Sequence, residues 1–395
     1  MVVGQFSQDV DVLVIGGGPA GYTAAFRAAE LGKTVAIVDP NETLGGECLH
    51  HACIPSKSSL LNVDAKNTVA TLSKGLDQRC KSLDVERLFG VAHFENKKTV
   101  QVTGEVVSIV KFRKAIIASG SKTRIDAAYP NAIQVEKVYT ESIENKKILV
   151  VGNTPNAVEA ATFLQTNKNT VTILSDGEIL PTFQRKLVRG MQRELTICKE
   201  APSPEDFDLV ILASHRLPET STLQLDNANV NVVEGVITTD ATCATSNPKI
   251  YAVGECAGCE HSASLAIAQG RVAGESASGV EAHLDSMFVP QVVWSSPELA
   301  QVGNFDNEVV SMPWGNSGLA VALGQHGVTM LGFEKETQAI TGVGIVGHGA
   351  TEMIAAGVLA LEMGATLYDL SSTIHPHPTR SELLTLCAQQ ALADQ

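Results

Sequence analysis

The chain has 395 residues and a formal net charge of −14 at pH 7; 44% of its residues are hydrophobic and 5% are aromatic. The acidic balance argues against nucleic acid or an anionic membrane as the main partner, and the aliphatic-rich composition suits an α/β protein. No apolar run reaches the roughly 18 residues of a membrane span. Residues 1–11 lack Lys and Arg and resemble neither a signal nor a transit peptide, so we expect a cytoplasmic protein of two or three domains.

The first predicted unit is strand, turn, helix and strand. Residues 10–15 and 33–39 have the apolar pattern of buried strands, and an Ala-rich helix lies between them. The turn carries the spacing of a dinucleotide-binding fingerprint, Gly16, Gly18 and Gly21, and Asp39 follows about 20 residues on. These glycines permit a tight turn and close approach of a pyrophosphate to the helix N-terminus, and Asp39 can accept a hydrogen bond from a ribose hydroxyl.

Two cysteines, Cys48 and Cys53, follow this unit in the segment GGECLHHACIPSK (residues 45–57). A disulfide that closes so short a loop removes little entropy from the unfolded chain, so a structural disulfide is not expected. A regular helix holds residues five apart too far from each other for an unstrained S–S bond, so the backbone must distort there. Strained disulfides are the labile ones, and we predict a redox-active pair rather than two inert buried cysteines.

Further along the chain, a second strand–turn–helix–strand unit begins at residues 147–152 and has its second strand at 170–174. Its turn keeps Gly152, but Thr154 replaces the second glycine of the fingerprint. In an intact fingerprint this second glycine lets the pyrophosphate come close to the backbone. Buried strands at 207–213 and near 250–253 and a helix of small residues at 262–279 follow. That helix should pack closely against a ligand or a neighbouring strand.

From about residue 287 the pattern changes. Strand-like runs at 291–294, 318–323, 330–334 and 339–346 predict an antiparallel sheet. Helices are predicted at 350–363 and 378–392.

The remaining cysteines give no metal site. Among eight cysteines, Cys256 and Cys259 alone have the Cys–x–x–Cys spacing, and a second such pair is missing, so no zinc is expected. This pair either forms an auxiliary thiol relay or, as we favour, consists of small buried residues at a helix start.

The dinucleotide unit, the cysteine segment and the C-terminal sequence His375-Pro-His377-Pro-Thr379 occur in an order that resembles the class I pyridine nucleotide–disulfide oxidoreductases, most of all the dihydrolipoamide dehydrogenase group. The resemblance covers nearly the whole chain. It implies an α/β fold with two Rossmann-like domains, for FAD and NAD, and an α+β dimerisation domain in a homodimer. The implied boundaries are 1–142 with 244–286, 143–243, and 287–395. The regions after Lys57 and between residues 194 and 207 look short, so we expect a compact variant.

The resemblance also implies catalytic roles. Cys48 matches the thiol that exchanges with substrate, and Cys53 the thiol nearest the flavin. His377 matches the catalytic base and Glu382 the carboxylate that orients it. The need for such a base is independent of the family, because a thiol of ordinary pKa is mostly protonated at neutral pH. His375 is expected to support the loop.

The FAD contacts are likewise implied by the resemblance. Lys57 matches a lysine beside flavin N5, and Glu159 its paired carboxylate. Glu255 replaces the usual aspartate that binds the ribityl chain. Further implied FAD contacts are Gly46, Ala92, Ser119, Gly120, Gly254 and Ala263.

Departures from the family pattern cluster in the second nucleotide site. Ser175 stands where an acidic residue would hold the ribose, and Asp176, one place later, can substitute. His215 replaces a glycine near the nicotinamide, where its ring could block the pocket. A NAD site at Gly152 and Asp176 is therefore expected to be weakened or lost. Between the cysteines, His50 and His51 either tune a thiol or are tolerated surface substitutions.

The sequence thus predicts an enzyme that passes electrons from a dithiol through a Cys48–Cys53 disulfide and FAD to NAD. The dithiol is either a small molecule or part of a lipoyl-bearing protein. One alternative keeps this chemistry with a protein, quinone or oxygen as acceptor. The other is a flavin-binding relative that no longer turns over.

Overall fold

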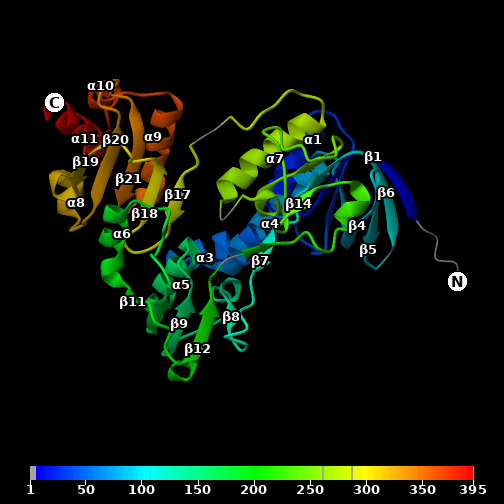
Figure 1. The fold of residues 1–395 in the computed structure, drawn as a ribbon, viewed down its shortest axis with the longest axis horizontal. Helices are drawn as coiled ribbons and strands as arrows, with labels where there is room; N and C mark the ends of the chain where they lie inside the picture. Colours follow the sequence, from blue (N-terminus) through cyan, green and yellow to red (C-terminus); the bar gives the residue numbers. More distant parts are fainter. Residues whose placement is uncertain (1–5, 106, 215, 260–261, 286–287, 395) are drawn as a thin grey trace. The chain divides into compact units, whose positions relative to one another are not determined.

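The computed structural model describes residues 6–105, 107–214, 216–259, 262–285 and 288–394. The chain divides into two compact units, each made of two segments (Figure 1). Unit 1 consists of residues 1–124 and 216–285, and unit 2 of residues 125–215 and 286–395.

Unit 1 is built on a seven-stranded sheet of order β3-β2-β1-β6-β5-β4, in which β16 also pairs with β6. Strands β3, β2, β1, β6 and β16 run parallel, whereas β5 and β4 extend the sheet as antiparallel strands. The strands are β1 (Phe6–Ile15), β2 (Val35–Asp39), β3 (Glu86–Phe89), β4 (Val91–Asn96), β5 (Thr99–Thr103), β6 (Ser108–Ile117) and β16 (Ile250–Ala252), with short pairs β7 (Ser121–Thr123) and β13 (Arg216–Pro218), and β14 (Val232–Val233) and β15 (Val236–Ile237).

The helices of unit 1 include two predicted ones, the Ala-rich helix between the first two strands and the helix over 262–279. They are α1 (Pro19–Glu30), α2 (Gly46–His50), α3 (Cys53–Leu60), α4 (Ala65–Ser82) and α7 (Ala263–Ala277), with 3-10 turns η4 (Leu225–Ala228) and η5 (Gly254–Ala257). The small residues of α7 pack closely against α1, and the helix also contacts the strands β6 and β16. A Cβ added at Gly270 would lie 2.3 Å from the Ala20 carbonyl oxygen of α1.

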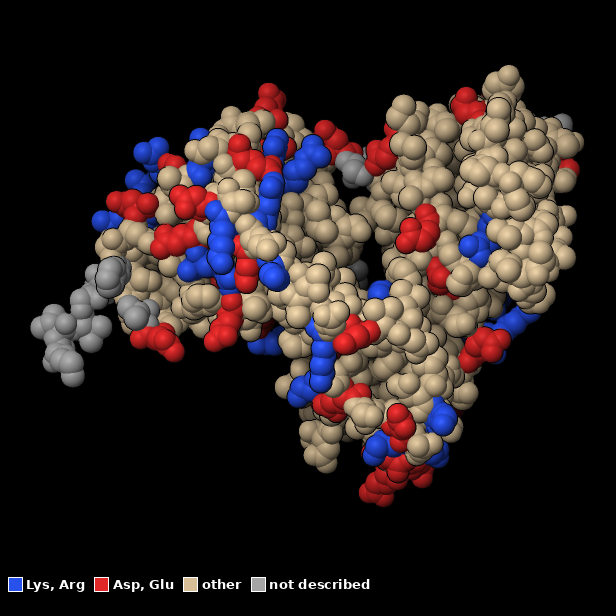
Figure 2. Space-filling view, turned by 180° about the vertical axis from the view of Figure 1, so that it is seen from behind, with Lys and Arg blue, Asp and Glu red and all other residues tan. Residues whose placement is uncertain are grey.

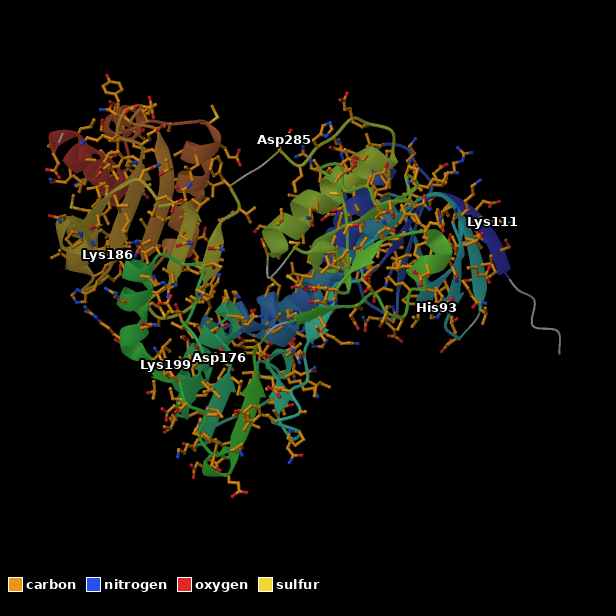
Figure 3. The ribbon with its side chains drawn as sticks, viewed as in Figure 1. His93, Lys111, Asp176, Lys186, Lys199 and Asp285 are labelled. Atoms are coloured by element: carbon orange, nitrogen blue, oxygen red, sulfur yellow. The ribbon has the colours of Figure 1, made fainter. Side chains whose placement is uncertain are left out.

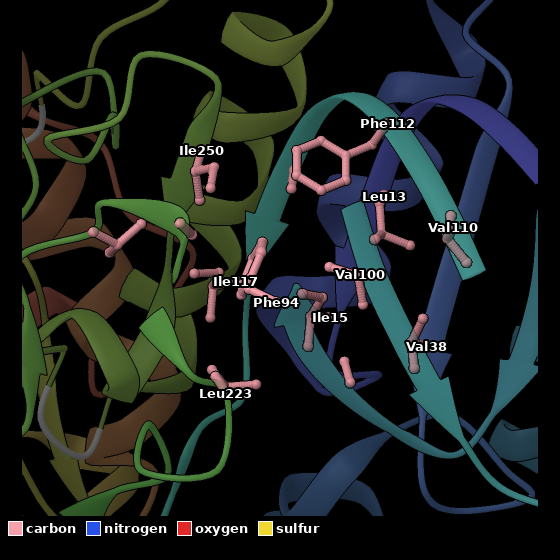
Figure 4. Packing of buried hydrophobic residues seen from close by; sticks show 14 of the residues in the cluster. Leu13, Ile15, Val38, Phe94, Val100, Val110, Phe112, Ile117, Leu223 and Ile250 are labelled. Carbon is pink, nitrogen blue, oxygen red and sulfur yellow. The ribbon is translucent and has the colours of Figure 1, made fainter. Parts of the chain in front are cut away.

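One face of the sheet in unit 1 is covered by a cluster of buried aliphatic and aromatic side chains (Figure 4). Phe94 is fully buried, and its ring meets the ring of Phe112 edge to face with centroids 6.1 Å apart. Leu223, far along the sequence, completes this cluster, and its carbonyl accepts a hydrogen bond from Phe94 N.

The contact between Leu223 and Phe94 bears on the expected domain boundaries. The family resemblance implies that residues 216–243 belong to the second Rossmann-like domain, whereas their contacts group them with unit 1. The strand β13 pairs with β7, and Asn227 Nδ2 donates to the carbonyl of Phe94. The segment therefore leaves the second sheet directly after β12 (Leu209–Leu212).

Unit 2 contains a five-stranded parallel sheet of order β11-β10-β9-β12-β8. This is the second Rossmann-like unit that the sequence predicts. Its elements are β8 (Ile133–Gln134), β9 (Lys147–Val151), β10 (Thr170–Leu174), β11 (Thr196–Cys198), β12, α5 (Pro155–Thr166) and α6 (Arg185–Met191), with 3-10 turns η1 (Val135–Lys137), η2 (Gln192–Glu194) and η3 (Pro204–Asp206).

The C-terminal part of unit 2 is an antiparallel sheet of order β17-β18-β21-β20-β19 with helices. Its elements are β17 (Gln291–Val293), β18 (Leu299–Gly303), β19 (Glu308–Pro313), η6 (Trp314–Asn316), α8 (Gly318–Ala322), β20 (Val328–Phe333), β21 (Ile340–Val346), α9 (Ala350–Glu362), α10 (Leu367–Ser372) and α11 (Glu382–Ala393). The predicted antiparallel sheet is confirmed. The strand predicted at 318–323 is wrong: the segment is the short helix α8, which Ser317 caps by accepting from Ala320 N.

On the face shown in Figure 2, acidic and basic side chains are interspersed. Within the described ranges, no helix is long and apolar enough to cross a membrane.

Candidate active site

The glycine turn between β1 and α1 is in contact with the start of the cysteine segment. Gly45 N donates to the Gly17 carbonyl at 2.8 Å. Gly46 has φ +56°, and a Cβ there would lie 2.7 Å from Gly18 Cα. Glycine is therefore required on the Gly46 side of this contact, and the turn fixes where α2 begins.

The same turn has the features of a dinucleotide cradle. Cβ atoms at Gly16 and Gly21 would lie 2.1 Å and 1.9 Å from carbonyl oxygens of neighbouring backbone. A Cβ at Gly18 would have no neighbour closer than Gly46 Cα at 4.0 Å, and Gly18 caps α1 without a side-chain hydrogen bond. The first N–H groups of α1 therefore face space that a phosphate can use. The Asp39 carboxylate accepts from Gly17 N at 2.6 Å beside it.

The two cysteines lie on either side of a break between two helices. Helix α2 ends at His50 and α3 begins at Cys53. At the break, Ala52 has φ −117° and ψ −93°, and its N–H donates to the carbonyl of Glu47, five residues earlier. The predicted backbone distortion is confirmed. It brings the Cys48 and Cys53 thiols within hydrogen-bonding reach of each other.

The surroundings of Cys48 keep its thiol protonated. Its pKa is raised by the hydrogen bond with Cys53, by burial and by the charge of Cys53. The Lys57 ammonium opposes this effect, and the Glu47 carboxylate adds to it. Because one proton shared by two close thiols stabilises the first thiolate, the second proton is held tightly.

The two histidines between the cysteines differ in their environments. His50 Nε2 lies 3.0 Å from the Leu44 carbonyl and 3.2 Å from Thr43 Oγ1, so its ring is held by the loop before α2. His51 is exposed, with its ring centroid 6.2 Å from that of His50. These contacts give His50 a structural role, in which its ring holds the loop before α2. His51 lies at the surface of the cysteine loop.

Sequence reasoning missed the buried guanidinium of Arg216. Its side chain is 7% exposed and donates to Ser121 Oγ and to the Ser121 carbonyl, each at 2.7 Å. It also forms an ion pair with Glu47, the residue before Cys48, and its Nε lies 3.5 Å from Glu255 Oε2. Ser121 Oγ in turn donates to Glu255 at 2.7 Å. Arg216 thus joins the cysteine helix to the predicted ribityl carboxylate.

The sequence could have indicated that a cation lies in this network. Glu47 places a carboxylate in the cysteine segment, and Glu255 places another at the predicted ribityl position. Two partly buried carboxylates require a nearby cation. Which of the chain's basic residues supplies it could not be read from spacing, because Arg216 is far from both acids in sequence.

The other predicted FAD contacts also lie in unit 1. Gly254, at φ +76°, begins η5, and its N–H donates to Gln269. Ser119 and Gly120 form the turn after β6, and Ala263 begins α7. Ala92 is 4% exposed within the hydrophobic cluster of β4, so its side chain belongs to the core. The glycine cradle offers helix N–H groups, and Asp39 and Glu255 offer carboxylates, which are the kinds of group that FAD binding requires.

Lys57 and Glu159 lie in different units. Lys57 follows Cys53 by one turn of α3, whereas Glu159 is 5% exposed in α5, where Oε1 accepts from Trp294 N at 3.0 Å. Their pairing beside a flavin therefore stays a prediction.

The predicted base and its carboxylate are in contact in unit 2. His377 Nδ1 lies 2.8 Å from Glu382 Oε1, and Thr379 N donates to Glu382 Oε2 at 2.7 Å. The hydrogen bond with His377, followed by that from Thr379, lowers the pKa of Glu382. The His377 side chain is 80% exposed, so its other nitrogen is accessible. His375 is half-buried beside this pair.

The second glycine turn differs from the first in the residue that caps its helix. Gly152 keeps a positive φ of +146°, but Thr154 fills the start of α5: its hydroxyl donates to the Ala213 carbonyl at 2.8 Å and accepts from Ala157 N. Ser175 is 1% exposed and donates to Gly177 O. Asp176, labelled in Figure 3, is exposed beyond the end of β10. His215 lies outside the described residues.

The Cys–x–x–Cys pair is divided between two hydrophobic clusters. Cys256 is fully buried, with Sγ 3.2 Å from the Val253 carbonyl. Cys259 is 1% exposed, with Sγ 3.2 Å from the Ser262 carbonyl, and burial raises its pKa to about 12. These contacts favour two packing residues over a thiol relay. No cluster of three or more metal-ligating side chains occurs among the residues that the structure describes.

Comparison with known families supports the resemblance seen in the sequence. Residues 10–197 and 188–270 match the pyridine nucleotide-disulphide oxidoreductase family, and residues 289–388 match its dimerisation domain. The chain is 30% identical to the dihydrolipoyl dehydrogenase of Bacillus subtilis (strain 168), over 99% of this chain and 98% of that protein. It is 33% identical to the dihydrolipoyl dehydrogenase of Thermus scotoductus, over 96% of each chain.

Solved structures show the same fold. The HOCl-induced flavoprotein disulfide reductase RclA from Escherichia coli superimposes with a TM-score of 0.87, at 22% identity, over 96% of this chain and 99% of that chain. The alignment with the Bacillus relative extends over 466 positions, more than the 395 residues of this chain. The relative thus has segments that this chain lacks, as expected of a compact variant.

Replacing Arg216 tests whether its guanidinium holds together the network of Glu47, Ser121 and Glu255. Arg216→Met should lower the free energy of unfolding by about 2–4 kcal/mol, because two carboxylates and a hydroxyl lose a buried charged partner. Urea unfolding measures this loss. Arg113→Met is the control, since its side chain is 85% exposed beside Asp11, and it should change stability by less than about 0.5 kcal/mol. Equal effects of the two substitutions would contradict a special role for Arg216.

Replacing Glu47 tests the electrostatics around Cys48. Glu47→Gln removes a negative charge that raises the pKa of Cys48, so more thiolate exists at a given pH. Alkylation of reduced Cys48 by iodoacetamide at pH 8 should become about two- to tenfold faster, with the pH–rate profile moved to lower pH. Mass spectrometry identifies the modified cysteine. Glu42→Gln, an exposed carboxylate in the loop before α2, should leave the profile unchanged; a shift to higher pH in Glu47→Gln would refute the assignment.

Proposed function

The chain belongs to the pyridine nucleotide–disulphide oxidoreductase family, and from that premise we propose that it oxidises a dithiol at the Cys48–Cys53 pair. The relatives named dihydrolipoyl dehydrogenase suggest a dihydrolipoyl group as the dithiol, free or carried on a protein. The family is one of flavin-dependent disulfide oxidoreductases.

One observation carries this proposal: the break between α2 and α3. A continuous helix would keep Cys48 and Cys53 apart, whereas the break at Ala52 brings the two thiols together. The pair can therefore open and close a disulfide without a large backbone movement. This favours a working enzyme over a flavin-binding relative that no longer turns over.

The exchange begins with the disulfide form of the pair. A substrate thiol gives its proton to His377, and the resulting thiolate attacks Cys48 Sγ. A bond forms between substrate sulfur and Cys48 as the Cys48–Cys53 bond breaks, and Cys53 leaves as a thiolate. The second substrate thiol then attacks the substrate sulfur that is bound to Cys48, and the bond between that sulfur and Cys48 breaks. Its proton goes to Cys48, whose pKa is raised, so Cys48 leaves as a thiol. The substrate is released as a disulfide, and the electron pair stays on the protein as the Cys48 thiol, the Cys53 thiolate and the protonated His377.

The base acts through its contact with Glu382. The carboxylate accepts from Nδ1, so the tautomer that leaves Nε2 available as a base is favoured, and it stabilises the imidazolium that forms. The matched dimerisation domain supports a homodimer. We propose that His377 of one subunit serves the cysteines of the other.

The residues that would hold FAD are the glycines of the first turn, Asp39 and Glu255, and the family resemblance adds Lys57. When bound, FAD supplies the two-electron acceptor that returns the cysteines to the disulfide. Lys57, one turn beyond Cys53 in α3, places a positive charge near the thiolate that leaves. Arg216 holds Glu47 and Glu255, and so fixes the cysteine helix relative to this site.

Counting thiols tests the redox pair. In the oxidised wild-type protein, unfolded in denaturant, two fewer thiols should react than after reduction with excess dithiothreitol, because Cys48 and Cys53 form the labile bond. In Cys53→Ser this difference should vanish. A thiolate next to a flavin gives a long-wavelength charge-transfer band, and Cys53 is the thiol expected nearest the flavin. This band of the reduced, flavin-loaded protein should therefore also vanish in Cys53→Ser. Cys387→Ser is the control, since this cysteine is fully buried in unit 2. This variant should keep the difference of two thiols between the oxidised and the reduced protein. A thiol difference that survives in Cys53→Ser would disprove the pairing.

Replacing the base tests the proton transfer. His377→Gln should slow reduction of the flavin by dihydrolipoamide by about 10²–10⁴-fold, and Glu382→Gln by a smaller factor, because positioned acid–base groups contribute on that scale. Anaerobic stopped-flow absorbance measures the rate. His283→Gln, a histidine 3.7 Å from Glu281 in unit 1, is the matched control and should keep the wild-type rate. Wild-type rates in His377→Gln would rule out its role as the base.

A further inference from the structure

The two glycine turns of this protein are built alike, which makes their difference informative. In each, the first glycine follows a parallel strand at positive φ, and a Cβ there would clash with a carbonyl oxygen: at Gly16 with Ala118, at 2.1 Å, and at Gly152 with Ala213, at 2.4 Å. The helices α1 and α5 that follow both have proline at their first position. The backbone of a dinucleotide turn is therefore present twice.

The two helix starts differ in the residue that caps them. Gly18 leaves the start of α1 without a side chain, and the first N–H groups have no side-chain partner. Thr154 occupies the same place before α5 and is 8% exposed. Its hydroxyl accepts from Ala157 N at 3.4 Å and donates to the Ala213 carbonyl at 2.8 Å. The side chain thus takes both the space and the N–H group that a pyrophosphate would use.

The ribose position differs in the same sense. Gly16 N donates to the Val38 carbonyl, and Gly152 N donates to the Leu174 carbonyl, so Asp39 and the residue after Leu174 are equivalent. That residue is Ser175, which is 1% exposed and whose hydroxyl donates to the Gly177 carbonyl at 2.9 Å. A buried serine hydroxyl engaged in this way offers no carboxylate to the two ribose hydroxyls.

We infer that Thr154 is a specificity-determining residue that closes the second dinucleotide turn, so that this protein does not bind a nicotinamide dinucleotide there. The inference rests on the proposed function, because it states where the electrons from the dithiol do not go. The family uses a pyridine nucleotide, and the residues of this turn do not fit one. The electrons from the dithiol then pass to one of the other predicted acceptors, which are a protein, a quinone and oxygen.

The experiment compares wild type with Thr154→Gly and Thr154→Ser as flavin-loaded proteins. Glycine reopens the turn and is a good N-cap, so the helix should survive, whereas serine keeps the capping hydroxyl. Binding of NADH is measured by calorimetry, and reduction of the flavin by NADH and by dihydrolipoamide is followed separately under anaerobic conditions. Flavin content and the rate with dihydrolipoamide serve as checks that each variant is folded.

Wild type and Thr154→Ser should bind NADH with Kd of about 1 mM or weaker, and Thr154→Gly should bind it at least about tenfold more tightly. Wild-type binding in the low micromolar range would overturn the inference, and so would equal affinities of wild type and Thr154→Gly. If dihydrolipoamide reduces the flavin of no variant, the proposed dithiol oxidation fails. The comparison of NADH affinities still decides the role of Thr154 in that case, because binding is measured without turnover.

Discussion

The contact between the first glycine turn and the start of α2 is the constraint on which the rest of the candidate active site depends. The hydrogen bond from Gly45 N to the Gly17 carbonyl joins the two segments, and the close approach of Gly46 to Gly18 leaves no space for a side chain at Gly46. The phosphate cradle and the cysteine segment therefore share one piece of backbone. Whatever the cradle binds lies, for this reason, near the helix that carries Cys48.

A local break then converts this placement into chemistry. The chain leaves the helix at Ala52, and α3 starts again at Cys53, so the two thiols meet across the break. Arg216 supports the arrangement from the other side, since it pairs with Glu47 directly before Cys48 and lies near Glu255. A buried cation between two carboxylates keeps the net charge of this region small and holds both acids in place.

The two Rossmann-like sheets illustrate how one backbone can keep or lose a binding site. Both keep the first glycine, because the carbonyl of the residue after the neighbouring parallel strand, Ala118 or Ala213, leaves no room for a Cβ. The second position decides what the turn can bind, since glycine leaves helix N–H groups available and threonine satisfies one of them itself. Stability of the helix and affinity for a phosphate thus compete for the same donors.

The sequence by itself determined the local features: the strand–turn–helix units, the glycines at Gly16 and Gly152, the need for a break between Cys48 and Cys53, and the spacing of His377 and Glu382. These depend on periodicity and on residues near one another in the chain, which spacing reveals. It mispredicted 318–323 as a strand, because a short apolar run fits either element until its cap is known. The tertiary structure decided the rest: that Arg216 reaches Glu47, that Thr154 bonds to Ala213, and that Leu223 completes the core around Phe94. Each of these contacts joins residues more than fifty positions apart, so the folded chain alone brings the partners together.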